Sequence, residues 1–105
     1  MLIRREQPAD VQAIHAVHTA AFQRPDDRNV PVEAGLVDAL RASDAWLPLL
    51  SLVACEPADG AVIGHVVCTR AAVAGRPALG LGPLGVLPGW QRRGVGGALM
   101  HGVLA

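Results

Sequence analysis

The sequence predicts an α/β protein of the α+β type, in which helices flank a mixed, mostly antiparallel sheet. Hydrophobic residues make up 51% of the 105 residues and charged residues 17%, a balance typical of a compact globular core. Apolar side chains recur every three to four residues in two early segments and in one final segment, which indicates helices. Between them, three apolar runs are joined by short turns, so we expect their strands to pair as antiparallel neighbours. The expected order is β-α-α-β-β-β-α.

The first half of the chain is expected to hold one strand and two helices. Residues 1–7 alternate like a short strand, and a helix follows over residues 8–22, where Pro8 and Asp10 supply start signals. One face of this helix carries Val11, Ile14, His18, Ala21 and Phe22. The second helix spans residues 30–43. Its buried side is expected to carry Leu36, Val37 and Leu40.

The second half is expected to hold three strands and a final helix. Residues 47–56 and 61–74 form a hairpin, because Asp59 and Gly60 are a strong turn signal between two apolar runs. A Gly-Arg-Pro turn leads into the next strand, and the last helix runs to the end of the chain. Its apolar face carries Val95, Leu99 and Val103.

A first glycine cluster, Gly80, Gly82 and Gly85, matches the letters G-x-G-x-x-G but lacks the structure that a dinucleotide-binding loop requires. In such a loop a helix begins at the glycines and points its N–H groups at a pyrophosphate. Here a β-branched residue and a Pro-Gly turn follow the cluster, and Pro83 has no N–H to donate. The cluster therefore does not predict a dinucleotide site.

The apolar side chains around this first cluster predict a β-bulge instead. Leu79 and Leu81 stand at odd positions, whereas Leu84 and Val86 stand at even positions, so a regular strand would place the two pairs on opposite faces. One extra residue near Gly82 and Pro83 returns all four to one face. A glycine-rich edge strand without a bulge is the alternative.

A second glycine cluster, Gly94, Gly96 and Gly97, opens the final helix. Glycine is a poor helix former, and close approach of a ligand to the backbone explains three glycines in the first turn. The free N–H groups and the positive end of the helix dipole would then face an anion, to which Arg92 and Arg93 add positive charge. The alternative is a helix start that the glycines merely make flexible, beside two solvated arginines.

These residues resemble the acyl-CoA-binding signature of the GNAT superfamily of N-acyltransferases, in which a bulged strand and a short turn precede Q/R-x-x-G-x-G/A at a helix start. Here the motif reads Gln91, Arg92, Arg93, Gly94, Val95, Gly96, with Gly97 and Ala98 completing the turn. The preceding LGPLGVLP resembles the family's fourth strand, and the expected element order resembles the family's N-terminal half. The resemblance implies a GNAT-like fold lacking its C-terminal part, as a single domain over residues 1–105 that is truncated after the cofactor-binding helix.

The resemblance also implies an N-acetyltransferase that moves an acetyl group from acetyl-CoA to an amine by direct attack. Backbone N–H groups from Gln91 through Ala98 would hold the pyrophosphate of coenzyme A. The backbone of Leu84, Gly85 and Val86 would pair with the pantetheine arm, and the N–H of Val86 or its neighbour would polarise the thioester carbonyl. Acetyl-CoA and an amine acceptor are the expected partners, and no metal is expected.

The sequence does not identify a catalytic base or acid. Some members of the family carry a glutamate on the fourth strand, but Gly80 stands at that position here. The chain ends at Ala105, before the region in which the family commonly places a general acid. His65 and Glu33 are weak candidates for a role at the amine. A non-catalytic CoA-binding or structural module is therefore the alternative function.

Several features exclude other classes. A formal net charge of zero argues against a nucleic-acid or membrane-surface binder. Cys55 and Cys68 lie in apolar runs, which predicts two reduced core cysteines. His15 and His18 lack a third metal ligand, so we expect ordinary surface or interface histidines. With no signal or spanning segment, the expected location is cytoplasmic. A homodimer is left open.

Overall fold

The computed structural model describes residues 1–105, and its elements follow the predicted order. Two single turns of 3-10 helix, η1 (Pro8–Asp10) and η2 (Pro88–Trp90), precede α1 and α3. No helix is both long enough and apolar enough to span a membrane. The strands are β1 (Leu2–Arg5), β2 (Trp46–Cys55), β3 (Val62–Val73) and β4 (Arg76–Val86). The helices are α1 (Val11–Phe22), α2 (Val32–Arg41) and α3 (Val95–Leu104).

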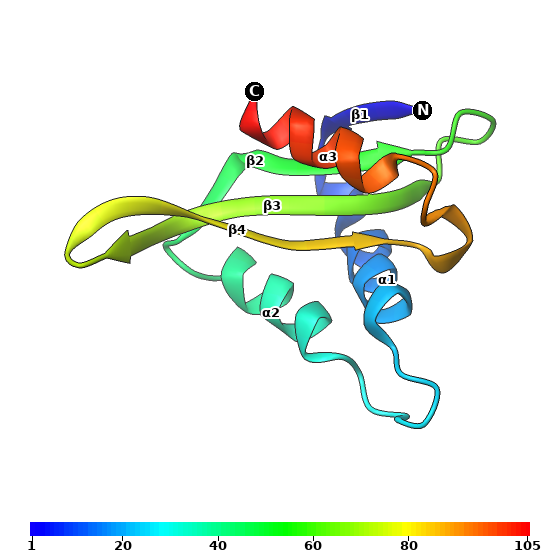
Figure 1. Ribbon diagram of the computed structural model, residues 1–105, viewed down its shortest axis with the longest axis horizontal. Helices are drawn as coiled ribbons and strands as arrows, with labels where there is room; N and C mark the ends of the chain where they lie inside the picture. Colours follow the sequence, from blue (N-terminus) through cyan, green and yellow to red (C-terminus); the bar gives the residue numbers. More distant parts are fainter.

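The four strands form one sheet in the order β1-β2-β3-β4, and every neighbouring pair is antiparallel. Figure 1 shows α3 on one side of this sheet and α1 with α2 on the other. The hairpin of β3 and β4 projects beyond the helices, where its side chains are exposed. β4 is an edge strand, so one side of its backbone has no neighbouring strand.

The sheet separates two apolar clusters. On the α3 side, the predicted helix face is confirmed, because Val95, Leu99 and Val103 are all buried there. Leu99 packs over Gly64, where an added Cβ would lie 3.0 Å from the Leu99 Cδ1 atom. The smaller cluster on the other side consists of Ile14, Val37, Val53 and Cys55. Both cysteines are buried and free of disulfides, as predicted.

The predicted buried side of α2 is partly wrong. Val37 is buried and Leu40 is half-buried, but Leu36 is 48% exposed and Ala34 takes the second buried position. Residues three apart share a helix face, and the small Ala34 side chain lets α2 approach its neighbours closely. Hydrophobicity alone favoured Leu36, which lies about 100° away around the helix from Val37.

The predicted bulge in β4 is confirmed. The register pairs Leu81 with Cys68 and Leu84 with Val66, so Gly82 and Pro83 together face Val67. This extra residue places the apolar side chains before and after the bulge on the α3 side of the sheet. It also leaves Gly85 pointing toward α1.

Because Leu99 fills the space above Gly64 and is 0% exposed, replacing it should open a cavity in the core between α3 and the sheet. We expect Leu99→Ala to lower the free energy of unfolding by about 3 kcal/mol in urea titrations. Leu104→Ala, at a position that is 65% exposed on the same helix, should change it by about 0.5 kcal/mol or less. Equal losses in the two variants would contradict the assigned core.

Candidate functional site

The turn between β4 and α3 leaves a run of backbone N–H groups unpaired. The N–H of Gln91 donates to the Pro88 carbonyl at 3.4 Å, and the N–H of Ala98 donates to the Gly94 carbonyl at 3.0 Å. Between them, the N–H groups of residues 92–97 donate no hydrogen bond within the protein. The first N–H groups of any helix lack intrahelical acceptors, and here the preceding turn extends that set. The result is a concentrated group of donors at the positive end of the α3 dipole.

Gly94 produces this geometry. It precedes the first residue of α3 with a φ of 85°, in the left-handed region that side chains rarely tolerate. A Cβ on Gly97 would meet no atom within 4 Å, so internal packing does not account for a glycine there. Gly96 faces the Leu84 and Val86 side chains, and its lack of a side chain lets α3 lie close to β4.

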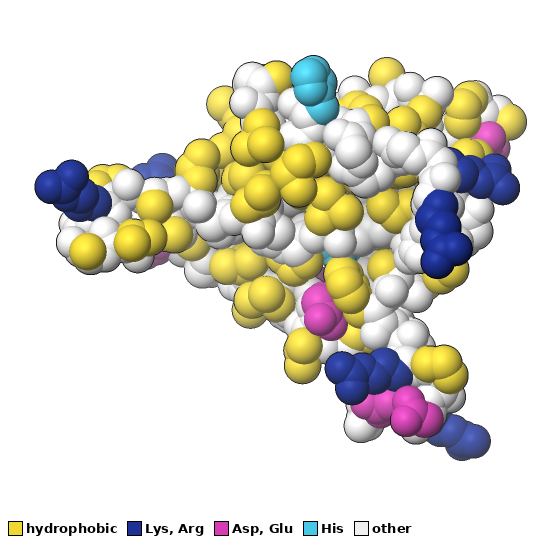
Figure 2. Space-filling model, in the orientation of Figure 1, with side chains coloured by type: hydrophobic (Ala, Val, Ile, Leu, Met, Phe, Trp, Pro, Cys, Tyr) yellow, Lys and Arg dark blue, Asp and Glu magenta, His cyan; other side chains and the backbone are white.

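Positive side chains border the unpaired N–H groups. Arg92 and Arg93 are exposed, and the Arg93 guanidinium lies over the Trp90 ring at 5.3 Å from its centroid. Figure 2 shows arginine side chains gathered at the end of the molecule where β4 turns into α3. An anion at this turn would meet two exposed cationic side chains as well as the backbone donors.

The adjoining edge of β4 offers a second set of backbone groups. The Leu87 N–H donates to the Ile63 carbonyl at 2.9 Å, and the register pairs Gly85 with His65. Because hydrogen bonding alternates along an antiparallel strand, the backbone groups of Leu84 and Val86 face away from β3. The Val86 carbonyl accepts a hydrogen bond from the Gln91 side chain at 3.0 Å, which ties the turn to the strand. The Val86 N–H points toward the open edge.

A buried chain of polar side chains crosses the sheet on its α1 side. It joins residues from five parts of the fold: Glu6, His18, Arg41, Ser51 and His65. The His18 and His65 rings are joined by a 2.8 Å contact between His18 Nε2 and His65 Nδ1. The Ser51 hydroxyl lies 2.8 Å from His65 Nε2 and donates to the Glu6 carboxylate, which also accepts from Arg41.

The far end of this chain is unpaired. His18 is 0% exposed, and its Nδ1 has no hydrogen-bond partner. The prediction of an ordinary surface or interface histidine is therefore wrong for His18. It holds for His15, which is partly exposed and pairs with Asp38 at 2.8 Å. His18 is buried because it lies one turn from Ile14 on the α1 face that packs on the sheet.

The surroundings shift the pKa values of the titratable side chains in this buried chain. Burial lowers the pKa of His18 to about 4, and the neighbouring His65 contributes to the shift. Burial also lowers the pKa of His65, although Glu6 opposes this. Burial raises the pKa of Glu6, but its interactions with the nearby His65, Arg41 and Ser51 outweigh it and lower the pKa to about 2. The two histidines are therefore neutral and Glu6 is ionised at neutral pH.

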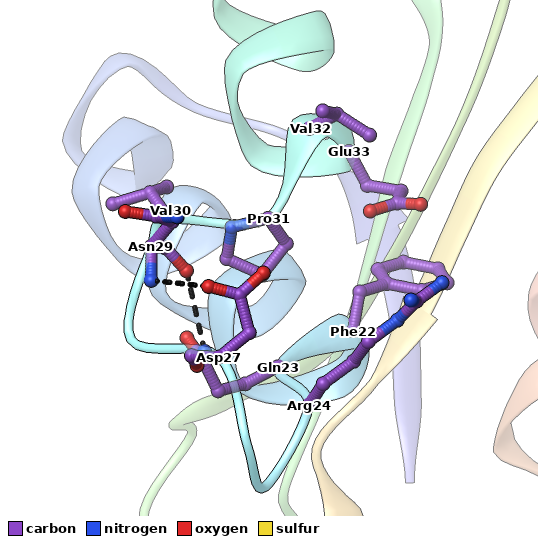
Figure 3. A pocket seen from close by; sticks show the side chains of 9 residues that line it. All are labelled: Phe22, Gln23, Arg24, Asp27, Asn29, Val30, Pro31, Val32 and Glu33. Carbon is purple, nitrogen blue, oxygen red and sulfur yellow. Dashed lines mark hydrogen bonds between the residues drawn. The ribbon is translucent and has the colours of Figure 1, made fainter.

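A cavity of about 410 Å³ lies between the end of α1 and the start of α2. Figure 3 shows Phe22 and Glu33 on one side of it and Asp27 and Asn29 on the other. The Asn29 N–H donates to Asp27 Oδ1 at 2.9 Å, which stabilises the intervening loop. Glu33 therefore lies at a cavity, whereas His65, the other candidate from the sequence, belongs to the buried chain. The structure does not bring these two candidates together in one cluster.

Sequence reasoning missed most of the buried chain. Glu6, Ser51 and Arg41 carried no signal as separate residues. Ser51 and His65 fall on the same sheet face because Val53 is paired with His65 and Ser51 with Val67. Strand parity combined with that register would have found this pair. Contacts with α1 and α2 depend on tertiary packing.

Residues 12–105 match the Acetyltransferase (GNAT) family. The uncharacterized N-acetyltransferase YjhQ of Escherichia coli (strain K12) is 36% identical over 97 residues, which cover 89% of this chain and 49% of that protein. The chain thus spans about half the length of this curated relative.

Solved structures agree with this match. A GNAT family acetyltransferase from Brucella melitensis, solved in complex with acetyl-CoA, has a TM-score of 0.83 and 42% identity. The alignment covers 98% of this chain and 65% of that one. The aminoglycoside antibiotic 6'-N-acetyltransferase AAC(6')-IG from Acinetobacter haemolyticus has a TM-score of 0.66 at 19% identity, over 99% of this chain and 69% of that one. This second similarity concerns the fold alone.

The pKa values of the buried chain predict that acid weakens the fold. Unfolded His18 binds a proton as the pH falls below 6.5, whereas folded His18 stays neutral down to about pH 4. Proton binding therefore favours the unfolded chain in this window, and His18 alone should remove about 2 kcal/mol of stability between pH 7 and pH 5. Below pH 4.5, protonation of Glu6 acts in the same direction until about pH 2.

Urea titrations at a series of pH values measure this loss. His101→Gln serves as a control because His101 is exposed on α3, and the variant should keep the same pH dependence. A free energy of unfolding that is constant between pH 7 and pH 4.5 would contradict the buried neutral state of His18.

Proposed function

Because the chain belongs to the acetyltransferase (GNAT) family, we propose that it binds acetyl-CoA at the β4–α3 turn and takes part in transfer of the acetyl group to an amine. The observation that supports this most strongly is the run of unpaired N–H groups over residues 92–97 at the start of α3. Unsatisfied donors at a helix N-terminus form a binding site for phosphate groups.

In this proposal the pyrophosphate of coenzyme A lies against the N–H groups of residues 92–97. Gln91 and Ala98 border the donor run, and the Gln91 side chain holds the turn against β4 through the Val86 carbonyl. Arg92 and Arg93 supply charge from the exposed side. The open space beside Gly97 gives the phosphates room to reach the backbone.

The pantetheine arm then follows the open edge of β4. Its amides would pair with the outward-facing backbone groups of Leu84 and Val86, as an added strand pairs with a sheet edge. Gly85 lies between them with its own backbone groups directed at β3. The Val86 N–H is the donor best placed to polarise the thioester carbonyl and to stabilise the oxyanion that forms when an amine attacks.

The acceptor amine is proposed to enter from the cavity between α1 and α2. Glu33 at this cavity would attract a cationic amine, and Phe22 offers an apolar wall. Attack by the amine on the thioester carbon is direct and forms no covalent enzyme intermediate. The contribution of the protein is then mainly the relative placement of the two substrates.

Calorimetric titration with acetyl-CoA tests binding, and release of free thiol with a panel of primary amines tests transfer. Binding together with amine-dependent thiol release is the expected result. Binding without release would favour a CoA-binding module, for which the glycine at position 80 is the supporting feature. Absence of binding to the folded chain would contradict both functions.

Gly97→Glu should block the proposed pyrophosphate site. The new side chain has open space to occupy, so the fold should be kept, but its bulk and negative charge would lie beside the N–H donors. We expect the acetyl-CoA dissociation constant to rise about tenfold or more. Gly35→Glu is the matched control, since Gly35 is also an exposed helical glycine with no atom within 4 Å of its Cβ position. Equal affinities in the two variants would exclude this site.

Arg92→Ala should weaken acetyl-CoA binding in a salt-dependent way. An exposed charge attracts phosphate most strongly at low ionic strength, because salt screens it. We expect a loss of about three- to tenfold at 20 mM salt, shrinking toward none at about 0.5 M. Arg76→Ala, at the start of β4 and far along the strand from the β4–α3 turn, should have no effect at either concentration. A loss that is the same at both concentrations would contradict a purely electrostatic contact.

A further inference from the structure

The hydrogen bonds of the buried chain have a direction, which the ionised Glu6 carboxylate determines. An ionised carboxylate only accepts, so the Ser51 hydroxyl donates to it. The Ser51 oxygen must then accept the proton on His65 Nε2, which leaves a lone pair on His65 Nδ1. That lone pair in turn accepts from His18 Nε2.

His18 Nδ1 is therefore a bare lone pair at the end of the chain. It has no partner in the protein and lies within a fully buried side chain. An unpartnered buried acceptor costs about 1–3 kcal/mol, so the arrangement is not explained by stability. The polar chain behind it supplies a carboxylate, a hydroxyl and an imidazole, all oriented to keep this nitrogen unprotonated.

His18 Nδ1 points at β4 in the segment proposed to hold the thioester. A Cβ on Gly85 would lie 2.7 Å from His18 Nδ1, closer than any side chain could remain. Glycine at this position thus allows the ring to approach the edge strand next to Val86. His18 also lies near the cavity proposed for the amine. Its ring stacks on Phe22, with ring planes 3° apart and centroids 6.1 Å apart. Phe22 lines the cavity between α1 and α2.

We propose that His18 Nδ1 is the proton acceptor of acetyl transfer, and that His65, Ser51 and Glu6 are positioning residues that set its tautomer and stabilise the charge it acquires. This inference rests on the proposed function. The amine acceptor supplies the proton, and no group outside the chain and the two substrates is required except water.

The amine nitrogen bonds to the carbonyl carbon, the carbon–sulfur bond breaks, and its electron pair leaves with the coenzyme A sulfur. The nitrogen loses one proton, which passes through a water molecule to His18 Nδ1 because the ring is buried. The imidazolium shares its charge through the hydrogen bonds to His65, Ser51 and Glu6, and the proton then passes from His18 to the coenzyme A thiolate, which leaves as the free thiol. The enzyme is left in its starting tautomers.

The charged groups around the chain favour a neutral base in the resting state. Asp38 and His15 lie on the outer side of His18, where they act in opposite directions on its pKa. Around His65, Glu6 and Asp10 favour the charged form and Arg41 opposes it. The nitrogen in the tetrahedral adduct is cationic and far more acidic than a free ammonium. A base of low pKa can therefore accept its proton.

Histidine side-chain NMR on the ¹⁵N-labelled protein tests the direction of the chain without any substrate. We expect both His18 and His65 to carry their proton on Nε2, with an unprotonated Nδ1, at about pH 7.5. His15 is an internal reference because it pairs with the exposed Asp38. A proton on Nδ1 of either buried histidine at neutral pH would overturn the proposal.

Kinetic measurements on the folded protein test the function of the buried polar chain. Ser51→Ala removes the hydroxyl that bridges His65 and Glu6, whose Nε2 and Oε1 atoms lie 3.7 Å apart, and we expect kcat for amine acetylation to fall about ten- to a hundredfold. The acid limb of the kcat–pH profile, which reports protonation of His18, should shift, while the dissociation constant of acetyl-CoA stays unchanged. Glu6→Gln keeps an acceptor for Ser51 but removes the charge, so it should act in the same direction and replaces Ser51→Ala if that variant does not fold.

His15→Gln is the matched control, since it changes a histidine one turn away on α1 without touching the chain. It should retain the kcat and the pH profile of the unchanged protein. If the wild type turns over and Ser51→Ala and Glu6→Gln keep its kcat and pH profile, the assignment of His18 as proton acceptor is overturned, while the proposed function stands. Failure of the wild type to bind acetyl-CoA would instead overturn the proposed function.

Discussion

The extra residue in β4 is the constraint on which the rest of this structure depends. Gly82 and Pro83 together face one residue of β3, which changes the face of every later side chain in the strand. Leu84 and Val86 then pack beneath α3, and Gly85 turns toward α1. Without the insertion, the strand would present a leucine to His18 and a glycine to the α3 core. One bulge therefore affects both the β4–α3 turn, where we propose that an anion binds, and the surroundings of the buried histidine.

The two parts of the candidate site are built from different chemistry. The β4–α3 turn offers backbone N–H groups, whose direction depends on Gly94 and on the start of α3. A neutral protein can bind an anion in this way because the positive potential is local. The buried chain instead depends on side chains from several elements, each placed by packing. The first part thus depends on backbone conformation, and the second on the identity of individual side chains.

The sequence predicted the features that follow from local periodicity. The parity of Leu79 and Leu84 indicated the bulge, and spacing identified the buried face of α3. It failed where tertiary packing selects between neighbouring positions, as in the burial of Ala34 in place of Leu36. The chain from Glu6 to His18 lay beyond sequence reasoning because its members are distant in sequence. Their approach requires strand register and helix docking together.

The energetics of the buried chain argue for function over stability. Replacing buried polar groups by well-packed apolar side chains is often neutral or stabilising, so such a network is weak evidence for a stable core. In this chain Ser51 and both histidines are fully buried, and His18 Nδ1 adds the cost of an unpaired acceptor. An interior selected only for packing would end the buried chain with an apolar ring at position 18, where Phe22 already stacks on the side chain. Polar groups that are buried at a cost in stability are typical of residues that act on a ligand. Of the unpaired atoms, His18 Nδ1 is the one that faces Gly85, beside the edge of β4 where the thioester is proposed to lie.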